Sequence, residues 1–140
     1  MNLDNTVDLL WILICAILVF LMQAGFMCLE AGCTRNKNNI NTALKNICDF
    51  GICMLAFWAC GYGLMFGNSL SGFVGTSDFL FLSKSPQAGA WFIFQAGFCG
   101  AAITIVSGAV AERLKFSMYL VISTVGAIFL YPLVGHWIWN

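Results

Sequence analysis

Four long apolar runs divide the chain, and short polar segments separate them. The runs cover residues 9–29, 47–66, 88–111 and 116–139. Each has at least about 20 residues, enough to cross roughly 30 Å of hydrocarbon as an α-helix. Helices are favoured over strands because an open sheet leaves backbone groups unpaired in lipid, and the alternation of a membrane barrel is absent. The pattern predicts an all-α, polytopic membrane protein with four transmembrane helices.

The composition agrees with this pattern. The chain is 61% hydrophobic and 9% charged, whereas a soluble domain has about 45–50% apolar and about 25% charged residues. These values exclude an ordinary soluble domain, and they exclude a disordered chain, which needs low hydrophobicity and high charge. Six basic residues balance six acidic ones, so the net charge does not indicate a nucleic-acid partner.

The distribution of charge predicts an orientation. By the positive-inside rule, loops rich in Lys and Arg are cytoplasmic, so the N-terminus and the middle loop, residues 67–87, face outward. The segment before the first run carries Asp4 and Asp8 and no basic residue, so we interpret that run as a retained span rather than a signal peptide. Five basic residues lie in the two cytoplasmic loops, Arg35, Lys37, Lys45, Arg113 and Lys115, and the sixth, Lys84, lies in the middle loop.

Neither metal nor catalytic chemistry is indicated. The seven cysteines are odd in number and form no CxxC pair, so we interpret them as buried free thiols rather than as a disulfide framework. One histidine and scattered cysteines do not make a metal site. The chain has no P-loop, no dinucleotide glycine fingerprint and no GxSxG motif. We therefore predict no enzyme, no cofactor and no metal site.

Polar residues within or beside the runs are few. We interpret Gln23 and Gln95 as hydrogen-bond donors between helices rather than as ligand groups. His136 is interpreted as a packing histidine, although an intramembrane ionisable residue also raises a functional hypothesis. Lys45 and Asp49 are four residues apart and can pair on one helix face. Charged residues at the cytoplasmic ends of the runs are interpreted as solvated or ion-paired: Glu30, Asp49, Glu112 and Arg113.

The third run carries an aromatic stripe and a small-residue stripe, both at helical spacing. Trp91, Phe94 and Phe98 form the aromatic stripe, and Trp139 ends the fourth run on the same outer side. Periodicity alone allows lipid contact, core packing or an aromatic vestibule, and ring faces of this kind attract a small cation. The small residues predict close approach of another helix: Gly97, Ala101, Thr104 and Gly108.

Three blocks resemble the ammonium transporter family (Amt/Mep/Rh), on its Amt side. They are VFLMQAGFMCLEAG (residues 19–32), FQAGFCGAAITIVSGAVAERLKF (residues 94–116) and YPLVGHWIW (residues 131–139). The TIVSGAVAER stretch is specific, and its spacing from HWIW fits the family. The resemblance implies that residues 1–140 are the N-terminal part of an Amt domain with about eleven membrane spans. It also implies a multi-pass cell-membrane protein with its N-terminus outside, a homotrimer when complete, and a PII-type signal protein as a further partner.

The resemblance also implies ammonium transport and a set of site residues. Phe94, Phe98 and Trp139 match the family's outer ammonium site. Trp139 and Phe94 would stabilise NH4+ by cation–π contact, and Phe98 would act as a gate that blocks open water. The cation then loses a proton before it passes a narrow apolar pore as NH3. His136 matches a motif position but receives no proton-relay role.

Two alternatives to a transporter remain open. The family's paired pore histidines and its second gate phenylalanine lie on later spans, so we expect this chain alone to be an incomplete transporter that does not conduct ammonium. The first alternative is an Amt-like sensor domain of a signalling protein. The second is a non-transporting regulatory subunit that assembles with longer paralogues.

Overall fold

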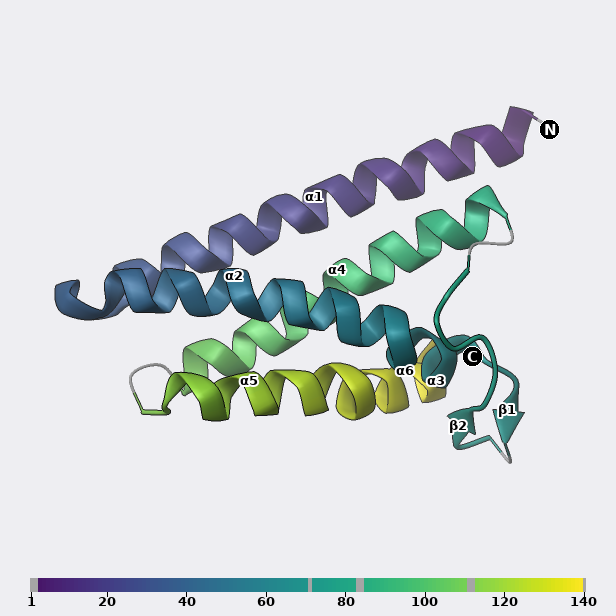
Figure 1. The fold of residues 1–140 in the computed structure, drawn as a ribbon. Helices are drawn as coiled ribbons and strands as arrows, with labels where there is room; N and C mark the ends of the chain where they lie inside the picture. Colours follow the sequence, from purple (N-terminus) through teal and green to yellow (C-terminus); the bar gives the residue numbers. More distant parts are fainter. Residues whose placement is uncertain (1–2, 71, 83–84, 111–112, 140) are drawn as a thin grey trace.

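The computed structural model describes residues 3–70, 72–82, 85–110 and 113–139. Lys84 and Glu112, singled out in the sequence, lie outside the described residues. The described chain contains four helices long and apolar enough to span a membrane, and Figure 1 shows how they lie. The prediction of an all-α membrane protein with four transmembrane helices is therefore confirmed. The spans are Asn5–Cys33, Asn36–Phe66, Pro86–Ala109 and Phe116–Trp139.

Two of the four spans, the second and the fourth, contain turns that are not α-helical. A short antiparallel hairpin also stands in the middle loop, where Ser69 pairs with Gly75. In chain order the elements are the helix α1 (Leu3–Cys33), the 3-10 turn η1 (Asn36–Asn38), α2 (Asn39–Ala56), the π turn η2 (Phe57–Gly61), α3 (Tyr62–Phe66), the strands β1 (Ser69–Leu70) and β2 (Val74–Gly75), α4 (Pro86–Ala109), α5 (Phe116–Val125), the π turn η3 (Gly126–Leu130) and α6 (Tyr131–Trp139).

The helix of the second span begins earlier than its apolar run. Hydropathy places the start at residue 47, whereas α2 begins at Asn39. The first turns of α2 are polar, but they bury Thr42, Lys45 and Asn46 against the other helices. Tertiary packing of polar side chains therefore extends this helix beyond the segment that hydropathy detects.

The fourth helix, α4, is the centre of the packing. Half of its apolar window is buried, against 17% for the first span, and it packs against both α1 and α2. A Cβ added at Gly97 would lie 2.9 Å from Val19 Cγ1 on α1. The small-residue stripe therefore lets α1 approach closely, as predicted. The buried core beside α4 includes Phe57, Cys99 and Ile103.

Each of the second and fourth spans contains one π turn, and the two turns, η2 and η3, pack against each other. Pro132 is the second residue after η3, and a widened turn relieves the clash between a proline ring and the carbonyl four residues earlier. In η2 the Trp58 carbonyl accepts a hydrogen bond from the Phe81 amide at 3.2 Å. The Ala59 carbonyl accepts one from the Leu80 amide at 2.9 Å. The π turn therefore also anchors the middle loop.

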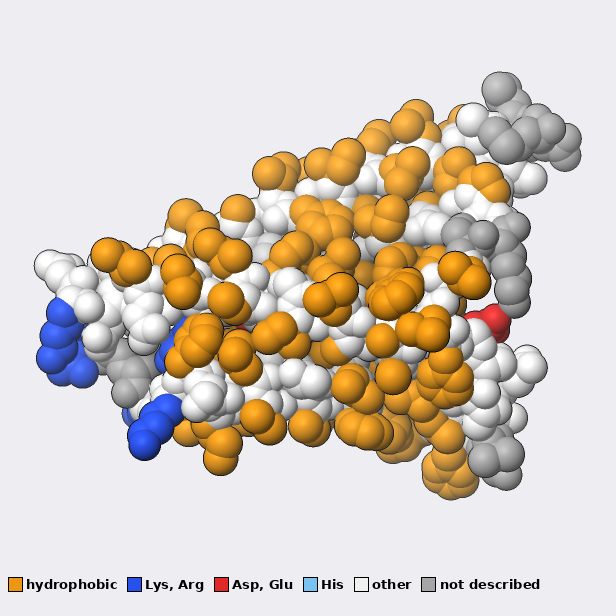
Figure 2. All heavy atoms as spheres, viewed as in Figure 1, with side chains coloured by type: hydrophobic (Ala, Val, Ile, Leu, Met, Phe, Trp, Pro, Cys, Tyr) orange, Lys and Arg blue, Asp and Glu red, His pale blue; other side chains and the backbone are white. Residues whose placement is uncertain are grey.

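Positive charge gathers at one end of the bundle, as Figure 2 shows, while apolar side chains cover the length of the spans. We call this end, where α1 leads into α2 and α4 leads into α5, the basic end. The opposite end holds β1, β2 and the C-terminus of α6, and we call it the hairpin end (Figure 1). The outward orientation of the N-terminus stays a prediction. The segments that form the basic end carry Arg35, Lys37, Lys45, Arg113 and Lys115.

Candidate functional site

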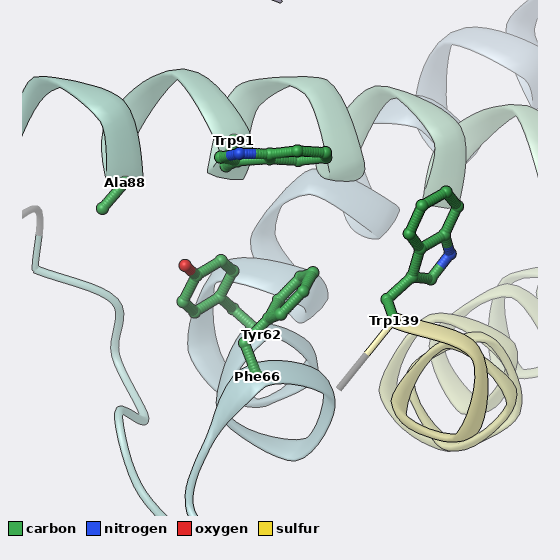
Figure 3. Close-up of a pocket in the computed structure, with 5 residues that line it drawn as sticks. All are labelled: Tyr62, Phe66, Ala88, Trp91 and Trp139. Carbon is green, nitrogen blue, oxygen red and sulfur yellow. The ribbon is translucent and has the colours of Figure 1, made fainter. Parts of the chain in front are cut away.

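A pocket of about 320 Å³ opens at the hairpin end between α3, α4 and α6. Figure 3 shows the ring of Trp91 on one side, those of Tyr62 and Phe66 facing it, and Trp139 beside them. The side chains of Trp91 and Trp139 are 38% and 59% exposed, so their ring faces are open to a ligand. Ala88 completes the lining, and none of these residues is charged.

An aromatic row runs from the pocket along α4. The rings of Trp91 and Phe94 are 5.6 Å apart between centroids, and those of Phe94 and Phe98 are 4.9 Å apart, both in edge-to-face geometry. Seven residues of helix cover about 10 Å, so the row leads from the pocket into the span. Trp139 thus lines the pocket, Phe94 joins it through Trp91, and Phe98, which is 37% exposed, lies one turn further in.

Two pocket residues, Tyr62 and Phe66, were not among the predicted site residues. They are four apart in α3, so they share one helix face, and their ring centroids are 5.1 Å apart. The centroid of the Phe81 ring, from the middle loop, lies 4.3 Å from that of Tyr62. The spacing of the two aromatics is visible in the sequence, but the helix that they face is not.

The chemistry of this pocket suits a small organic or inorganic cation with a weak hydration shell. Aromatic faces attract such ions through the ring quadrupole, and Trp is the strongest of the three aromatic types. Among the residues that the structure describes, no group of three or more His, Cys, Asp or Glu side chains could hold a metal ion. The pocket therefore offers cation–π contacts rather than metal ligands.

Comparison with known proteins decides the family. The family model described as "Ammonium Transporter Family" matches residues 10–140, nearly the whole chain. This chain belongs to the ammonium transporter family. The resemblance carried by the three sequence blocks is thereby confirmed.

Individual relatives agree with this assignment. The chain is 54% identical to the putative ammonium transporter sll0537 of Synechocystis over 97% of its own length and 25% of that protein. It is 46% identical to ammonium transporter Amt2 of Archaeoglobus fulgidus, over 99% of the chain and 30% of that protein. A solved structure named "Sensor Amt Protein" matches with a TM-score of 0.91 and 37% identity, over 96% of this chain and 34% of the other. The chain thus spans about a quarter to a third of the length of these proteins.

A buried polar network joins the spans in the half toward the basic end of this family member. Gln23 Nε2 donates to Thr104 Oγ1 at 2.6 Å, and Thr104 Oγ1 donates to Asp49 Oδ2 at 3.2 Å. Asn46 Nδ2 and Ser107 Oγ both donate to Glu30 Oε2, at 2.8 and 3.1 Å. The prediction that Gln23 bonds between helices is confirmed. These bonds link α1, α2 and α4.

Two interpretations of the charged residues are wrong. Glu30 and Asp49 were expected to be solvated or ion-paired, but they are 6% and 0% exposed and accept hydrogen bonds from neutral side chains. Within the described part of the chain, no hydrogen bond or ion pair joins Lys45 to Asp49. Lys45 Nζ instead donates to the Leu114 carbonyl at 3.2 Å, because its long side chain reaches past the helix face to the loop before α5.

The remaining predictions about polar residues concern Gln95, His136 and the cysteines. Tyr131 donates to Gln95 Oε1 at 2.8 Å, so Gln95 does bond between helices, as an acceptor. His136 is buried with hydrogen bonds on both ring nitrogens, which confirms a packing histidine. All seven cysteines are free. Cys53 and Cys99 are buried as predicted, whereas Cys28 and Cys33 are exposed on α1, whose surface the other spans cover least.

Proposed function

We propose that residues 1–140 form the N-terminal part of an ammonium transporter domain and carry its outer ammonium-binding site. One observation supports this proposal most directly. Trp139 lines an uncharged aromatic pocket together with Trp91, and Trp91 contacts Phe94 in the row that continues to Phe98. We infer ammonium as the substrate because the relatives are named as ammonium transporters. NH4+ has no apolar surface to bury, so ring faces are the part of this pocket that can attract it.

In this proposal each aromatic has a separate task. Trp139 and Phe94 hold NH4+ by cation–π contact, with the Trp91, Tyr62 and Phe66 rings completing the pocket. Phe98, whose ring stands further along the row, acts as the gate that keeps open water from following the cation. The cation would then pass its proton to a base supplied by the rest of the complete protein, and the resulting NH3 would cross an apolar pore. The complete protein would be a homotrimer in the cell membrane with its N-terminus outside, and a PII-type signal protein would be a possible regulator of it.

Replacement of Trp139 tests the binding site. In a transporter of full family length that begins with these residues, Trp139→Leu should weaken ammonium binding about 2- to 30-fold, the equivalent of a cation–π contact of roughly 0.5–2 kcal/mol. Competition of ammonium against methylammonium uptake measures the change. Trp11→Leu is the matched control, because Trp11 lies on α1, is exposed and does not line the pocket. Equal affinity in the Trp139→Leu and control proteins would contradict the proposal.

Replacement of Phe98 tests the gate separately. Phe98→Ala removes the ring but leaves Trp139 and Phe94 in place, so ammonium affinity should change less than in Trp139→Leu. Proton flux that accompanies uptake should rise, because water reaches further along the row. Measurement of substrate and proton flux in the same vesicles distinguishes the two effects, and no change in either flux would remove Phe98 from the mechanism.

A sensor is the second candidate function. The observation that favours it is the solved structure named "Sensor Amt Protein", with which this chain shares 37% identity at a TM-score of 0.91. A sensor would bind ammonium at the same pocket without net uptake. Quenching of tryptophan fluorescence by ammonium, lost in Trp139→Leu, combined with absence of methylammonium uptake would favour the sensor over the transporter.

A further inference from the structure

His136 is the one histidine of the chain, and it lies one helical turn before Trp139 in α6. It is only 2% exposed. Its Nδ1 lies 2.8 Å from the carbonyl oxygen of Met65, and its Nε2 lies 3.0 Å from Ser69 Oγ. Both partners flank the end of α3, Met65 within its last turn and Ser69 at the start of β1.

Both ring nitrogens of His136 have a hydrogen-bond partner. A carbonyl oxygen can only accept, so Nδ1 carries a hydrogen and donates to Met65. Nε2 pairs with the Ser69 hydroxyl, which can donate or accept. The Met65 carbonyl belongs to the last turn of α3, where carbonyls have no partner within the helix. His136 therefore caps the end of α3 from a different span.

Neighbouring contacts tie the same end of α6 to the same partners. A Cβ added at Gly135 would lie 2.5 Å from Met65 Cε, so glycine at this position lets α6 pack directly on the buried Met65 side chain. Trp137 Nε1 donates to the Phe73 carbonyl at 3.1 Å, in the turn of the hairpin. The end of α6 is thus held to α3 and to the hairpin on successive residues. Of these three hydrogen bonds, the one between His136 Nδ1 and the Met65 carbonyl is buried, and the one between His136 Nε2 and Ser69 is part-buried.

This attachment has a consequence for the pocket. The helix α3 supplies Tyr62 and Phe66, and α6 supplies Trp139. We propose that His136 is a positioning residue that fixes Trp139 relative to the α3 rings and thereby sets the affinity of the pocket for ammonium. The inference rests on the proposed function, because that function makes the pocket an ammonium-binding site.

Two substitutions of His136 separate positioning from general stability. In the full-length transporter, His136→Leu removes both hydrogen bonds and should raise the KM for methylammonium roughly threefold to tenfold, without exceeding the effect of Trp139→Leu. The maximum uptake rate per folded protein should stay within about twofold of the unmodified protein. His136→Asn keeps an N–H near the Nδ1 position and should restore most of the affinity. A parallel fall in rate with unchanged KM would overturn the inference.

A double-mutant cycle tests whether His136 acts through Trp139. In the Trp139→Leu background, His136→Leu should cause no further rise in KM, because there is no longer an indole to position. An equal rise in both backgrounds would overturn the positioning role. If Trp139→Leu raises KM and His136→Leu does not, this inference fails while the proposed function stands. If Trp139→Leu itself has no effect, the proposed function fails.

Ser69→Ala provides a test if the His136 variants do not fold. Ser69 lies in the exposed part of β1, so its loss removes the Nε2 hydrogen bond with little change to the core. We expect a KM change in the same direction as for His136→Leu but smaller, about twofold. An unchanged KM in Ser69→Ala, with Trp139→Leu still effective, would overturn the inference.

Discussion

The two halves of this four-span unit hold together by different chemistry. Toward the basic end, the carboxylates of Glu30 and Asp49 are buried and accept hydrogen bonds from side chains of other spans. At the hairpin end, aromatic rings meet around an open pocket that no charged residue lines. Polar atoms are thus committed to helix association in one half, whereas ring faces stay accessible in the other. The buried carboxylates therefore belong to helix association and lie apart from the aromatic pocket.

The energies involved are similar even though the roles differ. A hydrogen bond between membrane helices contributes about 0.6 kcal/mol on average and up to about 1.7 kcal/mol. An edge-to-face aromatic pair contributes about 0.5–1.5 kcal/mol beyond its buried area. Substitutions should therefore distinguish the two halves less by the size of the stability change than by whether ammonium affinity changes with it.

The largest loss of stability is expected where backbone meets backbone, at the hairpin. A Cβ on Gly75 would meet the Gly63 carbonyl, the Gly67 amide nitrogen and the Leu64 carbonyl, all backbone atoms. Gly75→Ala should therefore lower the free energy of unfolding by about 3 kcal/mol and weaken ammonium binding, because the hairpin supports α6. Gly51→Ala is the control, since nothing lies within 4 Å of its added Cβ. Denaturant titration in detergent micelles compares them, and equal stability of the two variants would contradict this packing.

A medium loss is expected in the polar half. Asp49→Leu removes the acceptor for Thr104 and Cys53 and should cost about 1–3 kcal/mol of unfolding free energy. Asp49→Asn keeps one acceptor oxygen and should cost less. The same titration measures stability, and methylammonium competition measures binding. A change of ammonium affinity as large as that of Trp139→Leu would contradict the claim that the polar half contributes to stability and not to binding.

The smallest effect is expected at the boundary between the halves. Tyr131→Phe removes the hydroxyl that donates to Gln95 at 2.8 Å and should cost about 0.5–1.5 kcal/mol. Because this bond joins α4 to α6, a double-mutant cycle with Gln95→Leu isolates it. Additive losses in the two single variants would mean that the bond contributes nothing to helix association.

The apolar runs predict the four spans because an apolar segment in lipid must satisfy its own backbone hydrogen bonds, which a helix does. They do not predict the first turns of α2, where Thr42, Lys45 and Asn46 are buried as polar side chains. For the same reason the sequence predicts Glu30 and Asp49 to be solvated, since one donor to each carboxylate, Ser107 and Thr104, lies 77 and 55 residues away in the chain. Long-range hydrogen bonds leave no periodic pattern in the sequence.

The candidate site is likewise predictable from the sequence only in part. Trp91, Phe94 and Phe98 share one helix, so their spacing alone predicts an aromatic row, and the row is present. Tyr62 and Phe66 enter the pocket only because α3 packs against α6, which no local pattern indicates. The roles of Phe94, Phe98 and Trp139 in binding come from the family resemblance, and they stay predictions.

The two π turns set the rotation of α3 and α6 about their own axes, and hence which side chains face the pocket. A π turn accommodates about one residue more than a regular helical turn, and each residue of an α-helix turns the chain by about 100°. The helices α3 and α6 both follow such a turn, at η2 and η3. Without the extra residue, Tyr62 and Phe66 would rotate away from α4, and Trp139 would rotate away from α3. The rings of the pocket therefore face one another because both helices are turned by a π turn before they reach it.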